Sequence, residues 1–102
     1  MTPREFFETM GNELEKVQGL GAVYQFNITG EDGGEWYVDA TGDEPSVGEG
    51  THPEPGATFT ATAEDFVAIA TGQLASQMAF MMGKLKVSGD MALAMRLQRI
   101  FP

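Results

Sequence analysis

Alternating apolar and polar residues predict most of the strands. Within residues 24–29, 35–40 and 57–62, every second residue is apolar. A period of two places those side chains on one face of a strand. The glycine-rich segment 30–34 suits a tight turn, so the first two stretches are predicted to form a hairpin. A shorter alternation over 84–88 predicts another strand, and an edge strand is expected around 46–48.

Helical spacing and capping residues predict the remaining elements. Thr2 and Glu5 fit a capping box, and the apolar spacing that follows predicts an amphipathic helix to about residue 18. Three more helices are expected over residues 63–72, 75–82 and from the cap residue Asp90 to about 101.

The order of these elements favours an α+β fold. Several consecutive strands lie between helices, which indicates a mostly antiparallel sheet covered by helices rather than a doubly wound parallel sheet. The chain of 102 residues is long enough for one domain, which we expect to span residues 1–102.

Charge and composition narrow the function classes. The net charge is −9, and all of it resides in residues 1–51, whereas residues 84–99 are locally basic. Such acidity argues against a nucleic-acid partner. No apolar run approaches a membrane span, and no secretion signal is visible, so we expect a cytoplasmic protein.

The sequence provides little for catalysis or metal binding. There is no cysteine, and the single histidine, His52, lies in a Gly/Pro-rich loop that we expect to be exposed to solvent. Asp39, Asp43 and Glu44 lack the ligand alternation of a calcium loop. We therefore expect neither an enzyme nor a bound metal or cofactor.

Five of the seven methionines fall between residues 78 and 95. Their i, i+3, i+4 spacing indicates either an ordinary core or a surface that adapts to ligands of varied shape. The last helix has an apolar arc of roughly 220°, wider than a helix needs to cover a sheet. A neighbouring helix, a second copy of the chain or a lipid are the alternatives that would take up this surplus.

Lys84 and Lys86 share the strand face opposite Leu85 and Val87. They fit either a contact to a carboxylate or phosphate head group, or a solvated face that discourages edge pairing.

The run from Gly83 to Leu97, GKLKVSGDMALAMRL, resembles the C-terminal signature of the sterol carrier protein domain family. Upstream, Gly34-x-Trp36, the threonine-rich strand at 58–62 and Glu64-Asp65-Phe66 also match, so the resemblance extends from about residue 6 to 101. It implies a twisted, mostly antiparallel five-stranded sheet covered by helices, with an apolar tunnel between the layers, and a non-catalytic role in lipid binding. The tunnel residues implied are Trp36, Phe66, Met78, Phe80, Met81, Met82, Met91, Met95 and Leu97, with Lys84 and Lys86 at the head group.

The chain ends in Arg99-Ile100-Phe101-Pro102 rather than in a peroxisomal address, and it resembles a short, stand-alone, prokaryotic-type member. A fatty acid or fatty acyl-CoA is therefore the expected ligand in preference to a sterol. The alternative is a dimerisation or accessory module of a lipid-metabolising enzyme, with the apolar helix face covered by protein. A homodimer and a transient membrane contact both agree with the wide apolar arc.

Overall fold

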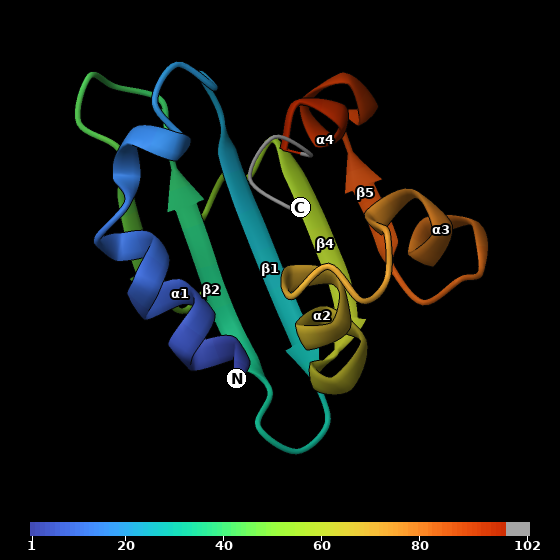
Figure 1. Cartoon of the computed structure of the whole chain (residues 1–102). Helices are drawn as coiled ribbons and strands as arrows, with labels where there is room; N and C mark the ends of the chain where they lie inside the picture. Colours follow the sequence, from blue (N-terminus) through green and yellow to red (C-terminus); the bar gives the residue numbers. More distant parts are fainter. Residues whose placement is uncertain (98–102) are drawn as a thin grey trace.

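The computed structural model describes residues 1–97, which form a five-stranded sheet with four α-helices and one 3₁₀ turn (Figure 1). The elements are α1 (Pro3–Gly11), η1 (Leu14–Lys16), β1 (Val23–Thr29), β2 (Gly34–Asp39), β3 (Ser46–Glu49), β4 (Ala57–Thr62), α2 (Ala63–Ala70), α3 (Ser76–Met81), β5 (Lys86–Gly89) and α4 (Met91–Leu97).

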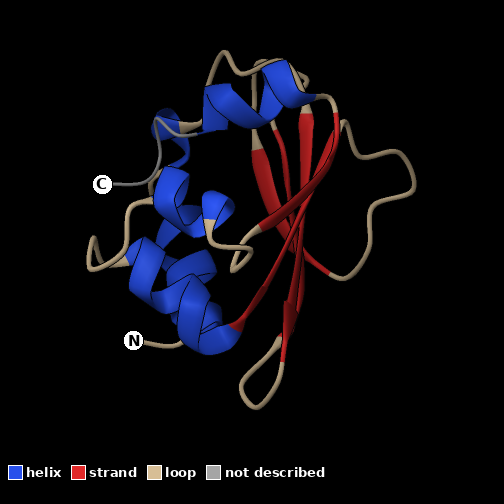
Figure 2. Cartoon of the chain, turned by 90° about the vertical axis from the view of Figure 1, so that its right-hand side faces the viewer, coloured by secondary structure: helices blue, strands red, loops and turns tan. Residues whose placement is uncertain are grey.

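The strands lie in the order β3-β2-β1-β4-β5. The central pair, β1 and β4, is parallel, and the other three pairs are antiparallel. Figure 2 shows the helices gathered on one face of the twisted sheet. The predicted α+β fold with a mostly antiparallel five-stranded sheet is confirmed.

The alternation predicted from the sequence determines which side chains face the helices. Phe26 of β1 is in register with Trp36 of β2 on one side and with Phe59 of β4 on the other, which makes an aromatic row across the sheet. Phe7 of α1 stacks on Trp36 and on Phe66 of α2, with centroid distances of 5.0 and 5.5 Å. These buried rings form the core between the sheet and helices α1 and α2.

The capping box at the start of α1 forms as predicted, but this helix is shorter than expected. The Thr2 hydroxyl accepts from the Glu5 N–H at 3.2 Å, and the Glu5 carboxylate accepts from the Thr2 N–H at 3.0 Å. Helix α1 then ends at Gly11, with Asn12 as its C-cap, and the chain continues through η1. Gly and Asn both disfavour the helix interior, so the predicted continuation to residue 18 is wrong.

The other boundaries agree within a few residues, and the end of the predicted last helix beyond Leu97 lies outside the described residues. Among residues 1–97, no helix combines the length and apolar character needed to cross a bilayer.

Candidate functional site

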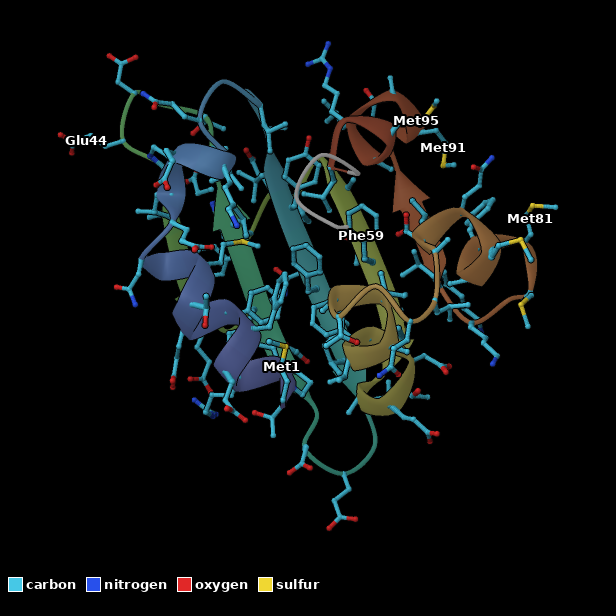
Figure 3. The ribbon with its side chains drawn as sticks, viewed as in Figure 1. Met1, Glu44, Phe59, Met81, Met91 and Met95 are labelled. Atoms are coloured by element: carbon cyan, nitrogen blue, oxygen red, sulfur yellow. The ribbon has the colours of Figure 1, made fainter. Side chains whose placement is uncertain are left out.

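Exposed apolar side chains gather at one edge of the molecule. Of the seven large hydrophobic residues exposed within residues 1–97, Met1 lies at the N-terminus. The other six lie on α3, just after it, or on α4: Met78, Phe80, Met81, Met82, Met91 and Met95. Figure 3 places Met81, Met91 and Met95 along the edge formed by α3, β5 and α4.

An open pocket of about 230 Å³ lies between these three elements. Its lining is mainly apolar and consists of Phe59, Ser76, Gln77, Phe80, Leu85, Val87, Met91, Ala94, Met95 and Leu97. We call this space the outer pocket. It is bordered by the sheet at Phe59 and Val87, which are paired in register between β4 and β5.

A sharp turn between β5 and α4 positions one wall of the outer pocket. Gly89 has a φ of +94°, and a Cβ added there would lie 2.5 Å from the Gly56 carbonyl oxygen, so this approach requires glycine. The Asp90 N–H donates to that same carbonyl oxygen at 2.9 Å. The Asp90 carboxylate then accepts from the Ala92 N–H at 2.8 Å, which fixes the start of α4.

A second, much smaller space of about 10 Å³ lies between α2 and the sheet. We call it the inner void. Its lining is Phe26, Ile28, Phe59, Ala61, Phe66, Ile69 and Leu85. Phe59 and Leu85 border both spaces, so the two spaces meet at these side chains. The continuous tunnel that the family resemblance implies stays a prediction.

The structure brings four of the nine implied tunnel residues to the outer pocket, namely Phe80, Met91, Met95 and Leu97. Met78, Met81 and Met82 lie on the exposed surface beside it and do not line it. Trp36 and Phe66 are buried in the aromatic core, and Phe66 also borders the inner void.

Sequence reasoning missed several lining residues. The alternation predicts that Phe59 and Val87 face inward from strands, and the structure confirms this, but the alternation does not predict a cavity. Leu85 is predicted in the same strand as Val87 and instead precedes β5. Their alternation was the available signal, since it placed them on the same face of the sheet as the helices.

Lys84 and Lys86 are both exposed, and neither lines the outer pocket. Lys86 is in register with Thr60, on the face of β5 opposite Val87. Lys84 borders a broad depression of mixed polar and apolar lining that also includes Glu64 and Asp65. Their contact with a head group stays a prediction.

His52 belongs to a polar network on the other face of the sheet. The buried Gln25 side chain accepts from the His52 N–H at 2.8 Å and donates to the Gly50 carbonyl oxygen at 3.0 Å. The His52 Nε2 lies 3.6 Å from the Asp39 carboxylate. The predicted solvent exposure of His52 is found only in part, because its side chain is half-buried where this network anchors its loop.

Asp39 belongs to the same network, and its pKa is lowered there. The Thr41 hydroxyl and the Thr41 N–H donate to its carboxylate at 2.6 and 3.1 Å, and these bonds hold the pKa of Asp39 below its usual value. Within residues 1–97, no three His, Cys, Asp or Glu side chains are grouped so as to hold a metal ion.

Comparison with known proteins gives a consistent family assignment. The model of the SCP-2 sterol transfer family matches residues 5–102. Hydroxysteroid dehydrogenase-like protein 2 of Rattus norvegicus is 42% identical over 87 residues, which is 84% of this chain and 17% of that protein. The chain thus spans about a fifth of the length of such relatives.

Solved structures show the same fold. The crystal structure of sterol carrier protein 2 like 2 from Aedes aegypti superposes with a TM-score of 0.77 at 28% identity, covering 95% of this chain and 94% of that one. The solution structure of palmitated SCP2L2 from Aedes aegypti gives 0.79 at 29% identity, covering 98% and 94%.

Proposed function

The chain belongs to the SCP-2 sterol transfer family, and from this we propose that it binds the hydrocarbon chain of a lipid in the outer pocket. The observation that carries the proposal is that apolar side chains of α3, α4 and the sheet edge line a pocket open to solvent. Burial of apolar surface supplies the affinity, at about 25 cal/mol per Å². The role is non-catalytic.

The size of the pocket favours a flexible, linear ligand. Its volume of about 230 Å³ is slightly below the roughly 300–1,000 Å³ of most small-molecule pockets. A linear acyl chain enters such a pocket one end first and extends inward when Phe59 or Leu85 rotates. A fused-ring sterol needs the full width at once. A fatty acid or fatty acyl-CoA is therefore the ligand we propose.

The head group is proposed to stay at the mouth of the pocket, in water. Lys84 and Lys86 flank Leu85, and long lysine side chains reach several ångströms beyond their backbone positions. Both are exposed, so contact with a carboxylate or phosphate would add little affinity and would mainly orient the ligand.

The relatives support a second candidate function. Because the matched region is about a fifth of hydroxysteroid dehydrogenase-like protein 2, the domain is also suited to act as an accessory module of a larger enzyme. In that case another protein would cover the exposed methionines of α3 and α4. This alternative predicts a stable protein complex and weak binding of free lipid.

A matched pair of variants tests the proposed site. Ala94 is buried in the pocket wall and Ala92 is exposed on the same helix, so Ala94→Phe fills the pocket and Ala92→Phe does not. Displacement of a fluorescent fatty acid by palmitate measures binding, and circular dichroism confirms that each variant folds. Selective loss of binding in folded Ala94→Phe supports the proposal. Equal binding by both variants would place the ligand elsewhere.

A further inference from the structure

We propose that Met91 and Met95 reduce fatty-acid hydroperoxides bound in the outer pocket, each methionine taking up one oxygen atom and becoming a sulfoxide. The inference rests on the proposed function, because it names a class of acyl ligand and adds a reaction to its binding. The reaction is stoichiometric rather than catalytic, since each methionine is consumed. It follows from the position of two accessible thioethers in the wall of the pocket.

Both thioethers line the pocket and remain accessible to solvent. Met91 and Met95 are 47% and 67% exposed, and both belong to the lining of the outer pocket. They lie about one turn apart on α4, and side chains at this spacing have Cβ atoms about 5–6 Å from each other. The buried residues of α4 are instead Ala94 and Leu97. The two methionines therefore occupy wall positions rather than core positions.

A thioether is the side chain of this molecule best suited to receive the oxygen. The chain has no cysteine, and its single tryptophan, Trp36, is buried. Methionine is oxidised to the sulfoxide without any change to its carbon skeleton. Oxidising equivalents that reach the outer pocket therefore meet thioethers first.

The reaction balances without a further reactant. The sulfur lone pair attacks the outer oxygen of the O–O bond. That bond breaks, an S–O bond forms, and the leaving alkoxide takes the proton of the former hydroperoxide. The products are a hydroxy fatty acid and methionine sulfoxide, so the sulfur loses the two electrons that the peroxide gains.

The lining also holds polar groups that suit an oxygenated chain. Ser76 and Gln77, in the first turn of α3, line the same pocket. A hydroxyl both donates and accepts hydrogen bonds, and a side-chain amide does the same. A plain hydrocarbon chain makes no hydrogen bonds. These two residues therefore favour a ligand with a polar group along its chain.

Oxidation would in turn change the pocket. A sulfoxide is polar where the thioether is apolar. Because acyl chains bind by burial of apolar surface, sulfoxides at Met91 and Met95 should weaken binding of the next acyl chain. Methionine sulfoxide reductases reverse this modification, and the pocket would then regain its apolar wall.

Exposure to solvent alone predicts a different order of oxidation. Met81 is 73% exposed and does not line the outer pocket. In Figure 3, Met81 lies on α3, whereas Met91 and Met95 lie on α4. A small oxidant in solution, such as hydrogen peroxide, should attack Met81 at least as fast as Met91. A bound hydroperoxide should reach Met91 and Met95 first.

Peptide mapping by mass spectrometry tests the proposal with the full chain. The protein is treated with linoleic acid hydroperoxide or with hydrogen peroxide, and the sulfoxide at each methionine is followed over time. Confinement in the pocket gives the peroxide an effective concentration of about 1 mM, against about 100 µM in solution, so Met91 and Met95 should react about tenfold faster than Met81. One hydroxy fatty acid should form per sulfoxide, and palmitate should slow the reaction by competition.

Matched variants locate the reaction. Met91→Leu with Met95→Leu should abolish rapid formation of the hydroxy fatty acid, and Met78→Leu with Met81→Leu should not. Folded Ala94→Phe, which fills the pocket, should lose the preference for Met91 and Met95, and Ala92→Phe should keep it. Oxidation by the lipid hydroperoxide that follows exposure, with Met81 first, would overturn the proposal. So would equal yields from the two leucine variants.

Palmitate binding measured by itself separates this proposal from the proposed function. A chain that binds palmitate but shows no selective oxidation of Met91 and Met95 supports the lipid site and overturns the reaction. A chain that binds no palmitate, yet is oxidised at these two methionines by the lipid hydroperoxide and not by hydrogen peroxide, supports the reaction and contradicts the proposed function.

Discussion

Phe59 and Leu85 each border both the outer pocket and the inner void. Phe59 belongs to β4 and stacks on Phe26 with ring centroids 5.3 Å apart. Leu85 precedes β5, and its N–H donates to the Ala79 carbonyl oxygen at 3.1 Å, which ties it to α3. Entry of a long acyl chain past the outer pocket therefore requires movement of one of these two side chains. Figure 3 shows Phe59 on β4, between α2 and α4 in this view.

Shortening Phe59 should change the preferred length of the ligand. Phe59→Leu removes part of the barrier between the two spaces, so palmitate should gain affinity relative to octanoate. Complete truncation to alanine costs about 3–5 kcal/mol in a core, which is why leucine is the better probe. Dissociation constants for a series of fatty acids measure the effect.

Phe7→Leu is the control for that series, because Phe7 lies in the aromatic core and lines neither space. It should lower the free energy of unfolding and leave the chain-length preference unchanged. If both variants shift the preference alike, Phe59 is not the barrier.

Gly89→Ala should disturb the pocket wall formed by α4. The positive φ and the 2.5 Å approach to the Gly56 carbonyl oxygen both oppose a Cβ at this position. Backbone strain of this type costs about 1–3 kcal/mol, and urea unfolding measures the loss. Gly11→Ala, where a Cβ meets nothing within 4 Å, should lose much less stability. Equal losses would refute the strain at Gly89.

Asp39 should contribute to the pH dependence of stability. Its hydrogen bonds from Thr41 lower its pKa in the folded state. The stabilisation is therefore present above the unfolded carboxyl pKa of about 3.9 and is lost as the pH falls through the lower folded pKa. Asp39→Asn should reduce the free energy of unfolding near pH 7 and flatten its fall in acid.

Asp43→Asn changes an exposed carboxylate in the loop that follows β2 and serves as the reference for that experiment. Urea titrations between about pH 3 and pH 7 cover the window set by the unfolded carboxyl pKa. An acid dependence that is identical in the wild type and in Asp39→Asn would contradict the role of the Thr41 bonds.

Local signals in the sequence predicted the elements of the sheet and its helices well. Successive side chains of a strand point to opposite faces of the sheet. The alternation around Phe26 and Phe59 therefore predicted the face on which each lies, and the two residues are paired in the register of β1 and β4. The N-caps at Thr2 and Thr62 were also predicted from the sequence. In the structure each hydroxyl accepts from the N–H three residues later. The parallel pairing of β1 with β4 depends on the order of strands in space, which local patterns do not encode.

The site was only partly predictable for the same reason. Helical spacing groups Met78, Met81 and Met82 on one side of the helix predicted over 75–82 but does not say which side of that helix faces the pocket. The structure turns Phe80 toward the pocket and leaves these three methionines exposed beside it. Trp36 and Phe66 are held in the core by stacking on Phe7, a contact between elements distant in the sequence.

Native mass spectrometry of the detergent-free protein mixed with palmitate tests the central claim most directly. The account predicts one palmitate per chain in the wild type and in Ala92→Phe, lost on denaturation and absent in folded Ala94→Phe. A wild-type chain that carries no palmitate at saturating concentration, or an Ala94→Phe variant that carries as much as the wild type, would contradict a lipid site between α3, β5 and α4.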